Sequence, residues 1–511
     1  MKIIQPINNQ LKAGAVLNYI VIILNAIVGL LYTPYMLRMM GQSEYGLYSL
    51  VASVISYLTI LDLGMGNAII RYTAKFRAEG KQKEQYEMFG MFFILYLIIG
   101  LLAVVIGMGL YLNVDSLFGK TMTDIELDRA RIMMLILIFN LAITFPMSIF
   151  GSIMTAYERF VFPRVINIIR IILNTVVMIA LLHYGYRAVA MVVVQTVFNV
   201  ITLIINYFYC RFYIKIKLYF RTFNWSFLKE VAIYSFWILL NVIMDKIYWS
   251  TGQFVLGAIS GTIAVSVFAV AIHLQGMYMQ FSSAISSVFL PKVTAMVTKE
   301  TSDVNLSNLF IRTGRLQFLV MCFILCGFIV FGKPFIELWA GVEYSEAYYI
   351  TLLFFISLLI PLIQNLGITI LQAKNEMKFR SLLYIAIAIV ALIMEIVLAK
   401  IWGGIGCAVA IAGALFLGQG LIMNIYYRRN QHLDINRFWK EILKMSIIPA
   451  VLVIIALLLR SFYTISSWRE LIVGVAVFSL LYIPLVFCFS MNSDEKRLVM
   501  EPILNIVKRA S

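Results

Sequence analysis

Five charged side chains lie inside apolar stretches of the sequence that are long enough to cross a membrane. A charge at the centre of a membrane helix costs about 2.5–3.5 kcal/mol on insertion scales, so such residues usually face a partner or a water-filled cavity. In that setting carboxylates and cationic side chains bind ions, exchange protons or hold a charged solute. The five residues are Asp62, Arg170, Asp245, Lys246 and Glu395.

Asp245 and Lys246 are adjacent and lie near the middle of the predicted helix 231–258. Neighbouring residues point about 100° apart around a helix, so one can face a cavity while the other is held by a neighbouring helix. Two interpretations stay open: a transport site, or a buried pair that fixes helix packing. As sites for a coupling ion we rank Asp245 first by depth, followed by Asp62 and Glu395.

Four basic residues are candidates for binding an anionic solute: Arg38, Arg71, Arg170 and Lys246. Arg38 and Arg71 lie at helix ends, where an arginine can also anchor the helix or contact lipid phosphate. Arg170 is close enough to the inner membrane surface for its long side chain to reach the headgroups. A guanidinium binds phosphate oxygens through two parallel hydrogen bonds, which a lysine cannot do. The sequence alone leaves the anchoring and the binding interpretations open.

The elements that position these residues are membrane helices. Of the 511 residues, 62% are hydrophobic and 13% are charged, whereas soluble domains are about 45–50% apolar and about 25% charged. A span needs about 20 apolar residues, and the apolar stretches predict an all-α polytopic membrane protein with 14 transmembrane helices. We expect them at 13–35, 46–70, 88–112, 131–155, 165–184, 188–209, 231–258, 263–288, 316–336, 347–371, 381–400, 406–427, 445–461 and 471–490.

The distribution of Lys and Arg predicts that both termini are cytoplasmic. With the N-terminus inside, the inner segments carry 30 of the 41 basic residues and the outer segments carry 9, while Arg170 and Lys246 lie within spans. Basic residues concentrate on the cytoplasmic side of membrane proteins. This bias accounts for the net charge of +16 without a nucleic-acid partner.

No segment of the sequence indicates catalysis, a metal or a cofactor. The longest predicted outer loop has about 18 residues, which is too short for a separate soluble domain. The five cysteines are scattered, and no His, Cys and Asp residues have metal-ligand spacing. A phosphate-cradling Gly-Lys-Ser/Thr loop is also missing from the sequence. We therefore expect a protein that is not an enzyme and does not use ATP directly.

Three landmarks recur at nearly constant separation and predict an internal repeat. They pair Gly41 with Gly261, 155–160 with 372–377, and 188–190 with 408–410. Both copies begin inside and contain six helices, so we expect two parallel lobes with a substrate site between them. The expected domains are a lobe at 1–209, a basic cytoplasmic linker at 210–230, a lobe at 231–427, two additional helices at 428–490 and a cytoplasmic tail at 491–511.

Several motifs resemble those of bacterial oligosaccharide (Wzx-type) flippases, and their order and spacing match from about residue 10 to residue 490. The first is Thr-Pro-Tyr-Met-Leu-Arg-Met-Met-Gly-Gln-Ser-Glu-Tyr-Gly-Leu-Tyr at 33–48. The others are Leu-Asp-Leu-Gly at 61–64 with Arg71-Tyr72, Gln-Ala-Lys-Asn at 372–375, and Phe-Gly-Lys-Pro-Phe at 331–335 followed by Trp-Ala-Gly at 339–341. The chain thus resembles the multidrug/oligosaccharidyl-lipid/polysaccharide exporter superfamily.

This resemblance implies a flippase of the bacterial cytoplasmic (inner) membrane. It would move a polyprenyl-diphosphate-linked oligosaccharide from the inner to the outer leaflet by alternating access, for surface polysaccharide export. The implied partners are the lipid-linked oligosaccharide, membrane lipids and the polysaccharide polymerase machinery. A drug or cation antiporter of the same fold is the alternative. A membrane polysaccharide polymerase or ligase ranks last, because it needs a large outer loop.

Overall fold

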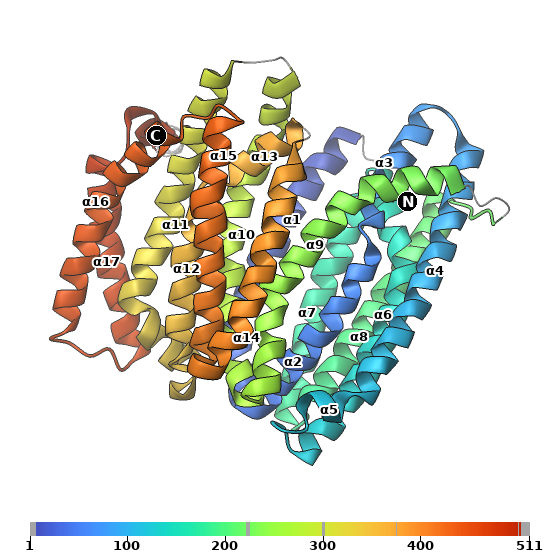
Figure 1. Ribbon diagram of the computed structural model, residues 1–511, viewed down its shortest axis with the longest axis horizontal. Coiled ribbons are helices and arrows are strands. Elements are labelled where there is room, and N and C mark those ends of the chain that lie inside the picture. The colour runs from blue at the N-terminus through green and yellow to red at the C-terminus, as the bar shows by residue number, and fades with distance from the viewer. Residues whose placement is uncertain (1–6, 221–224, 299–301, 375, 499, 502–511) are drawn as a thin grey trace, which may run out of the picture. The chain divides into compact units, whose positions relative to one another are not determined.

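The computed structural model describes residues 7–220, 225–298, 302–374, 376–498 and 500–501. Every regular element in these ranges is a helix (Figure 1). The chain divides into two compact units, Met1–Ala269 and Val270–Ser511, which we describe separately. Helix α10 (Thr262–Thr298) contributes residues to both. The all-helical architecture agrees with the fold class expected from the sequence, while the predicted domain boundaries stay a prediction.

Unit 1 is a bundle of long helices joined by short turns. Its elements are α1 (Ile7–Met40), α2 (Gln42–Leu58), the 3-10 helix η1 (Thr59–Asp62), α3 (Met65–Ala78), α4 (Gln82–Leu112), α5 (Val114–Phe118), α6 (Asp124–Ala156), α7 (Val161–His183), α8 (Ala188–Phe208), the π-helix η2 (Tyr209–Ile214) and α9 (Trp225–Ile259). Helix α6 packs against both α4 and α8.

Local sequence signals fix where the helices of unit 1 begin. At the start of α6, the Thr123 hydroxyl accepts a hydrogen bond from the Glu126 N–H, and the Glu126 carboxylate accepts one from the Thr123 N–H. This reciprocal cap satisfies backbone donors that the first turn leaves unpaired.

The turn glycines of the predicted repeat, Gly41 and Gly261, share a left-handed backbone with φ of 79° and 85°.

Unit 2 contains the remaining helices and carries its own core. Its further elements are α11 (Asp303–Trp339), the 3-10 helix η3 (Val342–Tyr344), α12 (Ala347–Ile363), α13 (Asn365–Ala373), α14 (Met377–Leu415), the π-helix η4 (Phe416–Ile422), α15 (Met423–Arg429), α16 (Ile435–Arg460) and α17 (Trp468–Phe489). The buried rings of Phe310 and Phe438 lie 5.0 Å apart, and Tyr427 packs beside them. Phe478 and Tyr482 of α17 belong to the same core, so α16 and α17, which lie outside the predicted repeat, share one core with α11.

The described residues contain eleven helices that are long and apolar enough to cross a membrane, or twelve if the bent pair α12 and α13 forms one span. One of the eleven, Met377–Arg429, has 53 residues and would be about 80 Å long if straight, more than twice the hydrocarbon thickness. A kink at Gly403, with φ 54° and ψ −130°, divides it. Helix α9 is not among the eleven. These spans make the chain an integral membrane protein, while the number fourteen stays a prediction.

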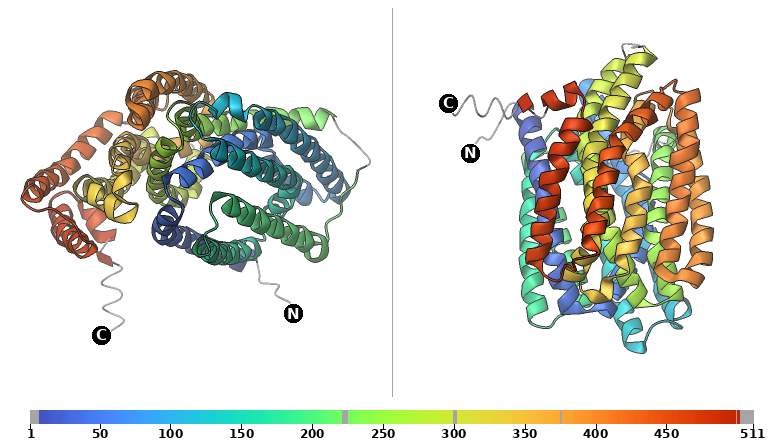
Figure 2. Two further views of the ribbon diagram at one scale, coloured as in Figure 1. Left: turned by 90° about the horizontal axis from the view of Figure 1, so that it is seen from below. Right: turned by 90° about the vertical axis from the view of Figure 1, so that its left-hand side faces the viewer.

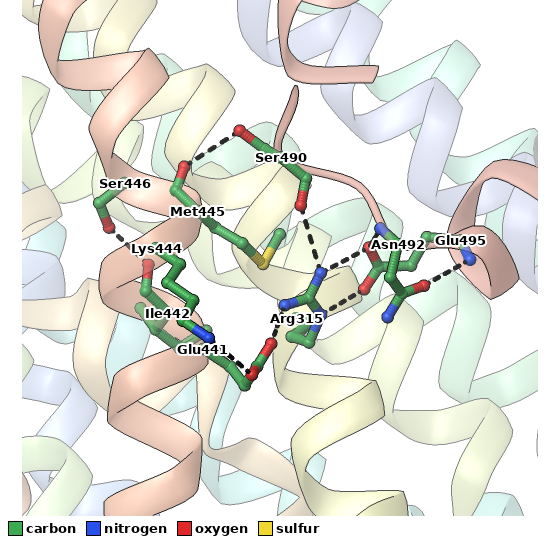
Figure 3. Close-up of polar contacts among 9 residues, drawn as sticks. All are labelled: Arg315, Glu441, Ile442, Lys444, Met445, Ser446, Ser490, Asn492 and Glu495. Carbon is green, nitrogen blue, oxygen red and sulfur yellow. Dashed lines mark hydrogen bonds and ion pairs between the residues drawn. The ribbon is translucent and has the colours of Figure 1, made fainter. Parts of the chain in front are cut away.

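A buried arginine ties α11 to the two C-terminal helices (Figure 3). Arg315, which is 5% exposed, donates to both carboxylate oxygens of Glu495 over 2.6 and 2.9 Å. It also donates to the Glu441 carboxylate of α16 over 2.6 Å and to the Ser490 carbonyl oxygen over 3.2 Å. We call these four residues the Arg315 clasp. Figure 2 shows α16 and α17 side by side, and the clasp joins the ends of both to α11.

The clasp predicts a large loss of stability when only one partner is removed. Arg315→Met leaves the buried Glu495 carboxylate without its cation, which costs about 3–5 kcal/mol in such settings. We expect a clearly lower unfolding temperature in detergent, and partial recovery when Glu495→Gln is added. Arg437→Met, which removes an exposed arginine bonded to Asn308, is the matched control and should change little. An unchanged unfolding temperature for Arg315→Met would show that the clasp contributes no stability.

The predicted orientation can be tested at helix ends that the structure leaves exposed. Glu79 and Asn436 lie at predicted inner ends and Lys120 lies in the predicted outer turn, and all three are exposed. In a background without native cysteines, a cysteine at position 120 should react with an impermeant thiol reagent added to intact cells. Cysteines at 79 and 436 should react only after permeabilisation. External labelling of position 79 in intact cells contradicts the orientation.

Candidate functional site

The predicted span 46–70 is interrupted in its second half. Helix α2 ends at Leu58, η1 follows, and Leu63 and Gly64 then adopt left-handed backbones with φ of 52° and 69° before α3 begins. A left-handed residue breaks the ladder of helical hydrogen bonds, and leucine adopts this conformation only at a cost. The sequence Leu61-Asp62-Leu63-Gly64 is therefore a helix break inside an apolar span.

Hydroxyl side chains lead up to this break along α2. Ser53 donates to the Leu50 carbonyl oxygen over 2.7 Å, Ser56 to that of Ser53 over 2.7 Å, and Thr59 to that of Ser56 over 2.6 Å. In a membrane, backbone groups freed by a break need a partner from protein or from a water-lined cavity. The break thus concentrates hydroxyl and backbone polar groups in one place.

Asp62 lies at the break and is held by α4. Its Oδ1 accepts a hydrogen bond of 2.9 Å from the Tyr96 hydroxyl. The Tyr96 ring is fully buried and stacks against Phe145 of α6, with ring centres 6.5 Å apart. Asp62 itself is half-buried. The Gly64 backbone also hydrogen-bonds the carboxylate, so neutral donors from α4 and from the break orient it. A carboxylate has about four acceptor positions, so capacity remains for a proton, an ion or a solute.

Helix α9 lies against α2 beside this break. Ser56 donates to the Ser250 hydroxyl over 3.1 Å, and Tyr57 shares a hydrogen bond with Thr251. Lys246 lies four residues before Ser250 and so shares its helix face, which is the face toward α2. Lys246 is half-buried, whereas the adjacent Asp245 is exposed.

We call Asp62, Tyr96, Ser56, Ser250 and Lys246 the broken-helix site. It places a carboxylate, a cation and several hydroxyls on neighbouring elements of unit 1, among apolar helices. The carboxylate can exchange a proton or bind a cation, and the ammonium can hold an anion. Among the described residues, no group of three or more His, Cys, Asp or Glu side chains is placed to hold a metal ion.

The other predicted cations lie elsewhere in unit 1. Arg38 is exposed near the end of α1. Arg71 is exposed on α3, and its guanidinium lies 5.7 Å from the centre of the Tyr72 ring. Arg170 is half-buried on α7 and donates to Asn167 over 3.0 Å. Of the four candidate cations, Lys246 is the one carried by α9, the helix that packs against both α2 and η1.

Glu395 lies in unit 2 and has no exposed surface. Neither of its carboxylate oxygens has a hydrogen-bond partner within the described part of the chain. Its surroundings on α14 include the buried Ala391 and Ala399, one turn away on each side. In this conformation Glu395 therefore cannot contact a solute.

Two polar clusters in unit 1 were not expected from the sequence. Asn199 of α8 donates to Asn140 and to Thr144 of α6 over 2.7 and 2.8 Å. The buried Glu44 forms an ion pair with Arg129 and accepts a hydrogen bond from the Ala188 N–H over 3.3 Å. Glu44 belongs to the motif at 33–48, so part of that motif serves helix packing.

Comparisons with known proteins agree with this architecture. The family described as "Polysaccharide biosynthesis protein" matches residues 11–297. The uncharacterized membrane protein EpsK of Bacillus subtilis (strain 168) is 19% identical over 498 residues, which cover 95% of this chain and 96% of that protein. The similarity to EpsK extends over both units.

Three solved structures share the fold at low sequence identity. The lipid II flippase MurJ in an inward closed conformation has a TM-score of 0.69 at 16% identity, covering 93% of this chain and 99% of that chain. An inward-facing MATE multidrug resistance transporter of the MOP superfamily has a TM-score of 0.60 at 16% identity, covering 81% and 99%. A MOP superfamily transporter from Pyrococcus furiosus has a TM-score of 0.54 at 14% identity, covering 81% and 92%.

These matches are to a flippase and to transporters, and at such identities they establish the shared fold alone. The family match is of another kind, because it extends over more than half of the chain and includes the motifs at 33–48 and 61–64. It confirms the resemblance that those motifs indicated. This chain belongs to the polysaccharide biosynthesis protein family.

Proposed function

We propose that this protein is a flippase that moves a polyprenyl-diphosphate-linked oligosaccharide from the inner to the outer leaflet by alternating access. The observation that carries the proposal is the broken-helix site, a polar interruption inside an apolar span. Interrupted helices supply substrate and ion sites in membrane transporters, because their freed backbone groups are tolerated only where they are buried in protein or line a cavity. The family and the fold shared with a lipid II flippase support the same function.

The balance of charge favours an anionic head group over a cationic drug. The candidate cations Arg38, Arg71, Arg170 and Lys246 all belong to unit 1. Of the three candidate acids, Glu395 is fully buried in unit 2, which leaves Asp62 and Asp245 as the acids able to meet a solute. In the Pyrococcus furiosus transporter, a reverse polarity of the binding pocket suggests a different function, so pocket polarity is a reasonable criterion in this fold.

In the proposed cycle the polyprenyl chain stays in lipid while the diphosphate-sugar head passes along the polar surface of the lobes. Lys246 attracts the diphosphate, and Arg38 holds it near the outer exit with a bidentate guanidinium. Arg71 and Arg170 supply positive charge toward the inner side. The break at Leu63 and Gly64 lets α2 and α3 change their relative angle, as hinges at element ends do.

In this proposal, net outward movement of the lipid-linked sugar is driven by removal of the product and by an ion gradient. The polysaccharide polymerase machinery consumes the lipid-linked sugar on the outer side and so removes the product. An ion gradient supplies a second driving force. An ion can drive the cycle only if its affinity differs between the inward- and outward-facing states. Asp245 is the first candidate because it is exposed beside Lys246, followed by Asp62 at the break. Glu395 ranks last, because an ion can reach it only in a conformation that exposes it. We place the protein in the bacterial cytoplasmic membrane with both termini inside.

Removing the charge of Lys246 should abolish most transport without loss of protein. In vesicles that contain a labelled lipid-linked oligosaccharide, Lys246→Gln should lower the initial rate about tenfold or more, which corresponds to about 1.4 kcal/mol of lost interaction with the head group. Lys400→Gln, an exposed lysine on α14, is the control. Wild-type vesicles that transport a cationic dye but no lipid-linked oligosaccharide would instead identify a drug or cation antiporter.

Neutralising Asp245 should uncouple transport from an ion gradient. With a proton or sodium gradient across the vesicle membrane, Asp245→Asn should bind the lipid-linked sugar normally but show no gradient-dependent rate. Asp128→Asn, an exposed acid of α6, should keep the dependence. Gradient-driven transport at the wild-type rate in Asp245→Asn rules this residue out as the coupling site, and loss of folding supports a packing role.

A further inference from the structure

A short extended segment of unit 1 is docked against the ends of three long helices. After α8, the π-helix η2 ends at Ile214 and Lys215 adopts a left-handed backbone with φ 62°. The chain then runs across the predicted cytoplasmic end of the unit. We call residues 215–220 the docked linker.

The docked linker is fixed to its neighbours by backbone contacts. The Ile216 N–H donates to the Cys210 carbonyl oxygen over 3.2 Å, and the Tyr219 N–H donates to the Tyr86 carbonyl oxygen of α4 over 3.1 Å. Ile216 is 2% exposed. A Cβ atom at Gly90 of α4 would lie 2.0 Å from the carbonyl oxygen of Tyr219, so only glycine permits this approach. The linker is therefore a packed element of unit 1.

Between this linker and the ends of α6 and α8 lies a cavity of about 350 Å³. Its walls carry the aromatic rings of Phe150, Tyr207 and Tyr219 and the cations Arg211 and Lys217, and none of the described residues that line it is acidic. Phe150 and Tyr207 meet edge to face with ring centres 5.0 Å apart, which fixes the aromatic wall. A cavity of this size accommodates a small polar head group.

The two cations that line the cavity are available to a ligand. Arg211 and Lys217 are both exposed. Arg211 donates from Nη1 to the Ile216 carbonyl oxygen over 3.3 Å, which orients the guanidinium while most of its five N–H donors remain for another acceptor. An arginine held in this way is suited to bidentate binding of phosphate oxygens.

We propose that this cavity binds the phosphate group of a membrane lipid at the cytoplasmic surface, with Arg211 and Lys217 as its ligands. Basic pockets between membrane helices on the cytoplasmic side bind lipid head groups in this way. The phosphate can belong to a resident anionic phospholipid or to a polyprenyl-linked phosphate. The site is separate from the broken-helix site, and the proposal does not depend on the transport function.

Native mass spectrometry of the full-length protein, purified and supplied with one lipid at a time, tests the proposal. The probes are phosphatidylglycerol, polyprenyl monophosphate and, as the neutral comparison, phosphatidylcholine. Arg211→Gln with Lys217→Gln should weaken binding of at least one anionic probe by about fivefold for each charge removed. The matched control removes two exposed inner-side lysines outside the cavity, Lys75→Gln with Lys378→Gln, and should bind as the wild type does.

A second variant tests the geometry while every charge is retained. Gly90→Ala places a Cβ against the Tyr219 carbonyl oxygen and should displace the docked linker, so that the anionic probe binds more weakly. Gly109→Ala on the same helix, where no atom lies within 4 Å of the added Cβ, should have no effect. Both variants are checked for an unchanged helical circular dichroism spectrum before lipid is added.

Each outcome separates the two sources of phosphate or overturns the proposal. Loss of phosphatidylglycerol binding in the charge variant identifies a resident phospholipid, and loss confined to polyprenyl monophosphate identifies a polyprenyl-linked phosphate as the source. Wild-type affinity of the charge variant for both anionic probes overturns the proposal. So does an equal loss in the Lys75 and Lys378 control. A protein that fails to transport any lipid-linked sugar can still pass this test, so the two proposals fail separately.

Discussion

The requirement that every backbone N–H and C=O group find a partner in the absence of water governs this structure. Helices meet it within one segment, which is why every regular element in the described ranges is helical. Where a helix is interrupted inside a span, the freed groups must be satisfied by hydroxyls, by neighbouring helices or by a water-lined cavity. The break at Leu61-Asp62-Leu63-Gly64 is such a place, and its approach is lined by Ser53, Ser56 and Thr59.

The same requirement, applied to side chains, separates structural charges from candidate functional ones. Arg315 is buried, but two carboxylates and a carbonyl oxygen satisfy it, so its task is to hold the C-terminal helices to α11. Asp62 accepts hydrogen bonds from the neutral Tyr96 hydroxyl and from the Gly64 backbone, and lies beside a polar break. A carboxylate held by neutral donors next to an interruption is better placed to bind and release an ion than one enclosed in a complete ion-pair network.

Much of the fold could be predicted from the sequence, because membrane helices are encoded by local composition. The break could not, since hydropathy averages over a window and does not register the left-handed backbone of Leu63 and Gly64. The sequence could not predict that Lys246 lies toward α2 and Asp245 toward the surface, because this depends on how α9 packs. The sequence alone places Arg315 in a loop, because nothing local indicates that Glu441 and Glu495, more than 120 residues away, will meet it.

The central claim is that the broken-helix site meets the head group of a lipid-linked oligosaccharide. The most direct measurement is photocrosslinking from a photoreactive amino acid at position 61, beside Asp62, to a radiolabelled polyprenyl-diphosphate oligosaccharide in membranes. Position 101, a leucine of α4 that is 66% exposed, is the control. The account predicts label at position 61 that unlabelled lipid-linked oligosaccharide displaces, with none displaced at position 101. Absence of label at position 61, or label there that the unlabelled compound does not displace, contradicts it.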